Sequence, residues 1–205
     1  MDYRKLALKL DSMDDKEYIE NFLLYNLAPV ISGVKPASTL TLKKGENQLY
    51  DKWSKYGEVF VREIGLDYIV LRETNSTDII LLYREDRLKE HLLNENNIEF
   101  LLRLGYEDDN DINTWLKTLK NRYEQYHCPH ELGIFLGIPV NDVEDFMNCT
   151  SKKCILCRYW KVYNDEAEAK RIFDKYDNIR KHTINKIIDN KDVISIANSL
   201  KTMVL

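Results

Sequence analysis

Over much of the chain, apolar positions recur at the three- to four-residue spacing of amphipathic helices. The first such stretch follows Asp14-Asp15. It is expected to stop at Ala28-Pro29, because the residue before a proline is pushed out of the helical region. The spacing predicts further helices over about 49–57, 84–104 with a break, 112–126, 165–187 and 193–200.

Short runs rich in β-branched and aromatic residues predict a sheet. Tyr68–Arg72 and Ile79–Tyr83 flank a polar turn and are expected to form an antiparallel hairpin. Residues 79–82 are apolar on both faces, so this strand is expected to be central and covered on both sides. Other strands are predicted at Thr39–Leu42, at Val59–Val61 and at Tyr159–Tyr163, the last in the same sheet.

Together these elements predict an α+β fold, a mainly antiparallel sheet with a hairpin covered by several amphipathic helices. Residues 1–180 are expected to form a single α+β domain. Residues 181–205 are expected to form a C-terminal helical extension, packed on that domain or on a partner subunit.

Composition narrows the classes of protein to consider. The 205 residues are 44% hydrophobic and 31% charged, with a net charge of −4. No dense lysine and arginine face is available to neutralise phosphates, which argues against nucleic-acid binding. The chain begins without a signal-peptide-like run and has no apolar stretch long enough for a bilayer, so we expect a cytoplasmic protein that spans no membrane.

The segment His127–Tyr163 concentrates the candidate chemistry, because it holds all four cysteines and two of the four histidines. Pro129 is suited to open a short helix ending at Leu136, with Cys128 as its N-cap and His130 and Glu131 in the first turn. A thiol there would tend towards the reactive thiolate, and the histidine could act as acid, base or ligand. Plain helix capping with a buried histidine is the alternative.

The cysteines also suggest a metal site. Cys149, Cys154 and Cys157 have the spacing C-x4-C-x2-C, and Cys128 could add a fourth ligand for iron or zinc. Incidental small residues of the core are the alternative. No Walker loop, GxGxxG, HExxH or GxSxG motif is present, so the commonest nucleotide, zinc-protease and serine-hydrolase classes are excluded.

Two lysines could meet an anionic ligand. On the predicted strand, Lys161 shares a face with Tyr159 and Tyr163, and Lys35 lies on a constrained loop between Gly33 and Pro36. Ordinary solvated lysines are the alternative.

Three elements in order carry a family resemblance: APVISGVK from Ala28, PHELGIFLGIP from Pro129, and WKVY from Trp160. They are similar to elements of an uncharacterised family common in clostridia and other anaerobes, known as domain of unknown function 3793. The resemblance implies a bacterial cytoplasmic protein without an established activity. Many members carry cysteine where this chain has Leu27 and phenylalanine where it has Cys128, which weakens a family-wide role for Cys128.

Two hypotheses about function follow. The first is a non-catalytic binding or regulatory protein that recognises a small anionic ligand or a protein partner. Its predicted surface combines Lys35, the pair His130-Glu131, Lys161 and Tyr163. The second is a metal-binding or redox protein, or an enzyme, that uses His130, Glu131 and the cysteines.

Overall fold

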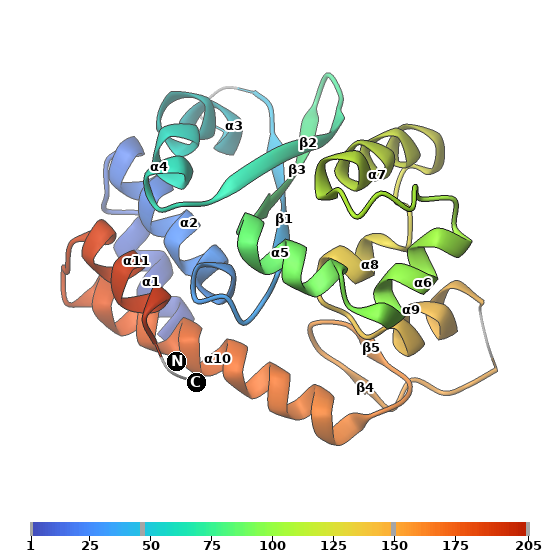
Figure 1. Ribbon diagram of the computed structural model, residues 1–205. Coiled ribbons are helices and arrows are strands. Elements are labelled where there is room, and N and C mark those ends of the chain that lie inside the picture. The colour runs from blue at the N-terminus through green and yellow to red at the C-terminus, as the bar shows by residue number, and fades with distance from the viewer. Residues whose placement is uncertain (1, 46–47, 149–150, 204–205) are drawn as a thin grey trace.

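A three-stranded antiparallel sheet lies at the centre of the molecule (Figure 1). The computed structural model describes residues 2–45, 48–148 and 151–203. The strands are β1 (Ala37–Lys43), β2 (Asp67–Glu73) and β3 (Thr77–Tyr83), in the order β1-β3-β2. The predicted α+β class, the hairpin and the central position of its second strand are confirmed.

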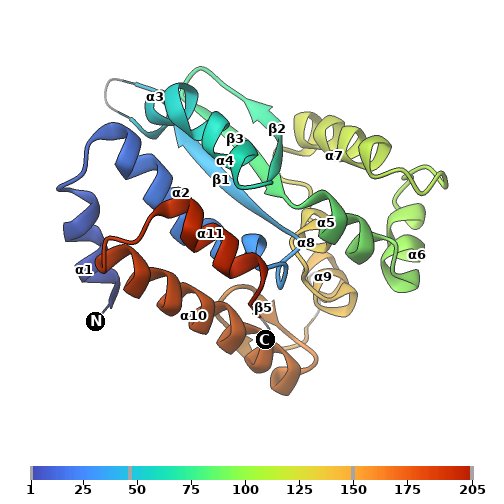
Figure 2. The same ribbon diagram turned by 60° about the vertical axis from the view of Figure 1, so that its left-hand side comes forward.

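One side of the sheet is covered by helices from both ends of the chain. Figure 2 shows α1 (Asp2–Leu10), α2 (Asp15–Ile31), α10 (Glu166–Ile188) and α11 (Val193–Lys201) gathered there. Their apolar faces form one core with the sheet, to which Leu23, Ile80, Ile184 and Leu200 contribute. Residues after 180 therefore pack into the same core as α2.

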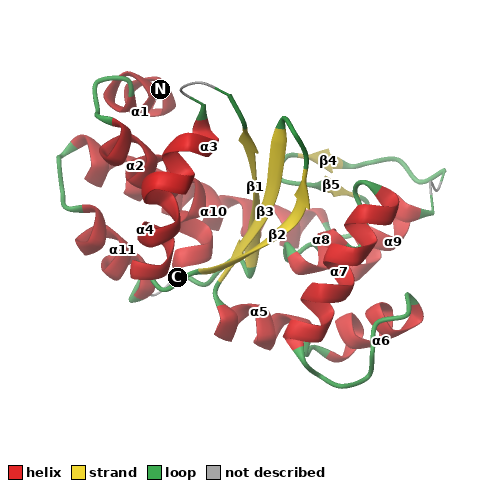
Figure 3. Ribbon diagram, turned by 90° about the horizontal axis from the view of Figure 1, so that it is seen from above, coloured by secondary structure: helices red, strands yellow, loops and turns green. Residues whose placement is uncertain are grey.

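The opposite side is covered by helices from the middle of the chain, as Figure 3 shows. These are α5 (Glu85–Leu92), α6 (Glu95–Arg103), α7 (Ile112–Tyr126), α8 (Leu132–Phe135) and α9 (Val140–Met147). Successive side chains of a strand point to opposite faces, so Ile80 and Leu82 enter the first core while Leu81 enters the second. Among the described residues, no helix combines the length and apolarity needed to cross a bilayer.

The helix predicted to stop at Ala28 instead continues through Pro29 to Ile31. Proline removes one helical N–H, but the run from Leu27 to Ile31 is fully buried, and its packing outweighs that loss. The helix ends when Ser32 N and Lys35 N donate to Ala28 O and Pro29 O, at 3.0 Å each.

The predicted strand at Val59–Val61 is wrong, and so is the predicted helix end near Gly57. Residues 49–63 are continuously helical as α3 (Leu49–Lys52), a π-helical turn (Trp53–Gly57) and α4 (Glu58–Glu63). Phe60 and Val61 are buried on its inner face and Val59 is 69% exposed. A short apolar run fits a helix as well as a strand, and here burial on one face decides.

The predicted place of Tyr159–Tyr163 in the central sheet is also wrong. Its residues Lys161–Val162 form β5, which pairs with β4 (Leu156–Cys157) in a separate two-stranded sheet. Both edges of β3 are occupied by β1 and β2, and among the described residues no further strand pairs with the outer edge of β1 or β2.

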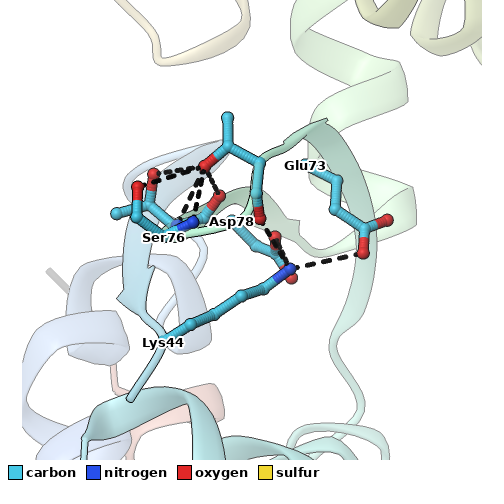
Figure 4. A network of polar contacts seen from close by, with 6 residues as sticks. Lys44, Glu73, Ser76 and Asp78 are labelled. Carbon is cyan, nitrogen blue, oxygen red and sulfur yellow. Dashed lines mark hydrogen bonds and ion pairs between the residues drawn. The ribbon is translucent and has the colours of Figure 1, made fainter.

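A polar network at the hairpin tip fastens the end of β1 to the turn between β2 and β3 (Figure 4). Lys44 Nζ lies 2.7 Å from Asp78 Oδ1 and 3.3 Å from Glu73 Oε1, and it donates to Thr74 O at 2.9 Å. Asp78 is only 6% exposed, so the lysine compensates a buried carboxylate. The charged side chains of Lys44, Glu73 and Asp78 therefore have a structural role.

Candidate functional site

A cavity of about 260 Å³ opens between α8, α9 and the residues around β5. Its walls come from the PHELGIFLGIP segment, from α9 and from the YWK segment. Most of the lining is apolar, contributed by Leu132, Leu136, Ile138, Val143, Phe146 and Trp160. Polar side chains also line it, among them Cys128, His130 and Lys161. Small-molecule sites share this pattern of apolar walls with a few polar groups.

Two glycines allow close packing around α8. A Cβ on Gly133 would lie 2.8 Å from Val143 Cγ2, so a larger residue would push α8 away from α9. Gly137 has φ +82°, and a Cβ there would lie 2.8 Å from Pro36 Cδ. Together with His91 Nε2, which donates to Ile134 O at 2.8 Å, these contacts fix α8 in place.

The predicted helix from Pro129 to Leu136 is shorter than expected. Only Leu132–Phe135 is α-helical, and its N-cap is Glu131 rather than Cys128. Residues 129–131 form a tighter turn, in which Pro129 O accepts from Leu132 N at 3.1 Å. The expected core positions Leu132 and Phe135 are buried, whereas Leu136 is only half-buried because it lines the cavity. Cys128 is thus exposed and outside the helix.

Asp142 on α9 holds the YWKVYN segment against the cavity. Its carboxylate is 2% exposed and accepts from Trp160 Nε1 at 2.8 Å and from the backbone N–H groups of Tyr163 and Asn164 at 2.9 and 3.1 Å. Asn164 Nδ2 donates to it as well, at 2.9 Å. The expected ligand residue Tyr163 therefore contributes through its backbone, and its half-buried side chain is not among the residues that line the cavity.

His130 and Lys161 both contact one aromatic ring, that of Phe146, at the mouth of the cavity. The His130 ring packs edge-on against Phe146 at a centroid distance of 5.0 Å, and Lys161 Nζ lies 5.4 Å from the centre of the same ring. Both polar residues are exposed, and Phe146 is 40% exposed. The mouth thus offers an imidazole and an ammonium beside an apolar interior.

Glu131, the neighbour of His130, is not among the residues that line this cavity. Its side chain is 1% exposed and pairs with Arg122 Nε, and Arg122 lies over the Tyr126 ring at 5.2 Å. Burial, followed by the Glu131 charge, raises the pKa of Tyr106 on the same side. The structure therefore gives Glu131 a buried partner inside the protein.

Lys35 lies apart from the cavity and is not among its lining residues. Its ammonium donates to Ser38 Oγ at 3.3 Å. Burial, with the positive charge of Arg180 as a second cause, lowers the pKa of Lys35 to about 8. Of the three polar elements expected on one surface, the structure thus brings together His130 and Lys161, and places Glu131 and Lys35 elsewhere.

The cysteines do not gather around one centre in the part of the chain that is described. Cys128 borders the cavity, whereas Cys154 and Cys157 are exposed in the β4 region and Cys154 Sγ donates to Leu156 O at 3.2 Å. Cys149 lies outside the described residues. Among those residues, no group of three histidine, cysteine or acidic side chains is placed to hold a metal ion. A zinc or iron site stays a prediction that elemental analysis of the purified protein would check.

A larger cavity of about 730 Å³ lies beside α6, bordered by asparagines, glutamates and Arg103. Several of these groups already have partners inside the protein: Asn97 donates to His91 O at 2.7 Å, and Arg103 pairs with Glu144. It offers little apolar surface to a ligand, so we place the candidate site in the smaller apolar cavity.

Four residues of this region were not predicted from the sequence: Asp142, Phe146, Arg122 and His91. A signal for Asp142 was available, because a buried tryptophan needs a hydrogen-bond acceptor and an aspartate beside the apolar Val143 could supply one. No comparable signal marked Phe146, since an aromatic residue in a helix most often joins the core.

Comparison with known proteins returned one result. No curated protein and no solved structure matches the chain. A family model described as "Protein of unknown function (DUF3793)" matches residues 23–197, a range that includes every residue that lines the cavity. The chain therefore belongs to the DUF3793 family.

Proposed function

We propose that the protein binds a small amphipathic anion in the cavity between α8, α9 and β5. One observation carries the proposal: the PHELGIFLGIP and WKVY elements form the walls of one apolar cavity, with His130 and Lys161 at its mouth. Neither polar residue forms an ion pair among the described residues, so both are available to a ligand.

The lining supports a ligand with an apolar body and one carboxylate. A cavity of about 260 Å³ holds roughly ten non-hydrogen atoms, if each occupies about the volume of a water molecule. The apolar body would contact Trp160 and Phe146, and the carboxylate would receive hydrogen bonds from Lys161 and His130. Charge-assisted hydrogen bonds of this kind are stronger than neutral ones.

We expect the protein to act in the bacterial cytoplasm, where such a module would sense or carry a metabolite. Nothing in the proposal requires a catalytic step.

The test uses matched pairs of aryl and alkyl carboxylates and their primary amides, titrated into the protein while the Trp160 indole N–H is followed by NMR. Trp160→Phe assigns that resonance among the three tryptophans. Carboxylates should shift the Trp160 signal at lower concentration than their amides, because only the acids carry the negative charge that pairs with the Lys161 ammonium.

Two variants serve as controls for this titration. Lys161→Met should remove the preference for the acids, and Lys89→Met, a change of the same kind at an exposed position of α5, should leave it intact. The proposal would be overturned if no compound of the series shifted the Trp160 resonance, or if acids and amides shifted it equally.

A further inference from the structure

The two outer edges of the central sheet differ in how they are protected. The β2 edge is interrupted by a bulge between Val70 and Arg72, and α7 packs against this strand. The β1 edge is regular, because β1 pairs with β3 residue by residue from Ala37 to Lys43. Among the described residues, no strand pairs with its outer edge. Natural proteins usually disrupt or cover such an edge, since its free backbone groups can pair with another chain.

The backbone groups of Thr39 and Thr41 point to the outer edge of β1. In an antiparallel pair, residues that exchange hydrogen bonds with the neighbouring strand alternate with residues that do not. Lys44 N donates to Ser76 O at 2.8 Å, so the even-numbered residues of β1 are the ones bonded to β3. The N–H and C=O groups of Thr39 and Thr41 therefore face away from β3. In the described part of the chain they form no hydrogen bond with the backbone of another element.

The side chains at this edge are exposed or only partly covered. Thr39 and Thr41 are exposed, and since Thr39 lies opposite Leu81 they are on the side of the second core. The helices that contact β1, α2 and α3, contribute to the first core on the other side of the sheet. On that side Leu40 is half-buried. The edge thus combines free backbone donors and acceptors with an apolar side chain that is incompletely covered.

We propose that β1 pairs antiparallel with β1 of a second copy of this chain, which joins two three-stranded sheets into one. A pairing centred on Leu40 places Thr39 of each copy opposite Thr41 of the other. These are the residues whose backbone groups point outward, so each such pair exchanges two hydrogen bonds. Because both copies use the same strand, the interface is closed by a two-fold axis.

The sequence of β1 favours a second copy as the partner. Threonine pairs directly opposite each other across two strands are favourable. Leu40 lies opposite Leu40 of the second copy, so each side chain covers the exposed part of the other. Lys43, the charged residue of β1, lies opposite Ala37, so no like charges face each other. The interface is separate from the proposed carboxylate cavity, because no residue of β1 lines that cavity.

The test measures self-association by sedimentation velocity from micromolar to submillimolar protein concentration. The natural protein should change from monomer to dimer as the concentration rises. It should not grow further, because the two-fold pairing uses the β1 edge of both copies. A monomer at every concentration, or continued growth beyond the dimer, would overturn the proposal.

Charge variants at the two exposed threonines test the register. Thr39→Lys/Thr41→Lys should stay monomeric, since lysines would face lysines across the two-fold axis. Thr39→Lys/Thr41→Glu changes the same positions but places each lysine opposite a glutamate, so it should still form the dimer. Melting temperatures confirm that both variants fold. Loss of the dimer in both folded variants, or in neither, would overturn the proposed pairing.

Amide hydrogen exchange gives a second readout in the natural protein. The N–H groups of Thr39 and Thr41 should exchange slowly in concentrated protein and faster after dilution, because their hydrogen bonds form only in the dimer. The N–H of Leu40, which bonds to β3, should stay protected at both concentrations and serves as the control. Exchange of Thr39 and Thr41 that does not depend on concentration would overturn the proposal.

Discussion

Two neighbouring residues of the PHELGIFLGIP element, His130 and Glu131, have opposite environments. His130 is exposed at the mouth of the cavity against Phe146, whereas Glu131 is 1% exposed and paired with Arg122. The YWKVYN segment repeats this division: Lys161 reaches the mouth, while Trp160 donates inward to Asp142. Each element therefore contains both a structural anchor and a residue free to meet a ligand.

Polar residues in one motif thus need not share one role. The buried carboxylates Glu131 and Asp142 accept donors from inside the protein and hold the walls. His130 and Lys161 have no such partners, so losing them should change binding but not folding. Stability and affinity measured on the same variants separate the two groups.

The largest loss of stability is expected for Asp142→Ala. It leaves the Trp160 indole N–H and two backbone N–H groups without their acceptor, and each buried unsatisfied donor costs about 1–3 kcal/mol. We expect the free energy of unfolding in urea to fall by at least about 3 kcal/mol. Asp142→Asn keeps an acceptor oxygen and should lose less; equal losses would show that the hydrogen bonds are not what matters.

Glu131→Gln should come next, because it leaves the Arg122 guanidinium without its counter-charge. Breaking a buried pair costs about 3–5 kcal/mol, and since Arg122 keeps 23% of its side chain exposed we expect about 2–3 kcal/mol. The double variant Glu131→Gln/Arg122→Met should regain part of this loss. If the losses of stability in the two single variants simply added up in the double variant, the two side chains would not be coupled. Glu131 would then not be an anchor.

Phe146→Ala should separate the mouth from the anchors. The ring is 40% exposed, so its removal should lower the free energy of unfolding by only about 1 kcal/mol. Binding of the carboxylate series should weaken more clearly, because His130 and Lys161 both pack on this ring. A large loss of stability with unchanged binding would place Phe146 among the anchors instead.

The smallest effect on stability is expected for His130→Gln. An exposed side chain without an internal partner changes the free energy of unfolding by no more than about 0.5 kcal/mol. The affinity for the best carboxylate should fall severalfold, as measured by calorimetry. A loss of stability as large as that of Glu131→Gln would contradict the difference in role between these two neighbours.

Sequence reasoning predicted the parts of the fold that have strong local patterns. The hairpin, the central strand and the helix Ile112–Tyr126 follow from alternation, turn residues and an unbroken apolar stripe. The helix end at Pro29 was predicted wrongly because burial of the surrounding residues outweighs the local backbone preference of proline. The strand within Tyr159–Tyr163 was assigned to the wrong sheet because the pattern of residues does not say which strand it pairs with.

The candidate site was predictable only in part, for a physical reason. Residue type indicated that four side chains could bind a ligand: His130, Glu131, Lys35 and Lys161. The position of each side chain in the folded protein decides which of them could reach one. Adjacent residues in a turn point different ways, and only the packed structure shows that Glu131 meets Arg122 while His130 meets Phe146.

We propose that Lys161 binds the carboxylate of a ligand at the mouth of the apolar cavity. The most direct measurement is the ratio of the dissociation constants of the best-binding carboxylate and its amide, in the natural protein and in Lys161→Met. One charge-assisted hydrogen bond predicts a preference for the acid of about tenfold, equivalent to about 1.4 kcal/mol, in the natural protein. That preference should shrink to less than about twofold in Lys161→Met and persist in Lys89→Met; an unchanged tenfold preference in Lys161→Met would contradict the account.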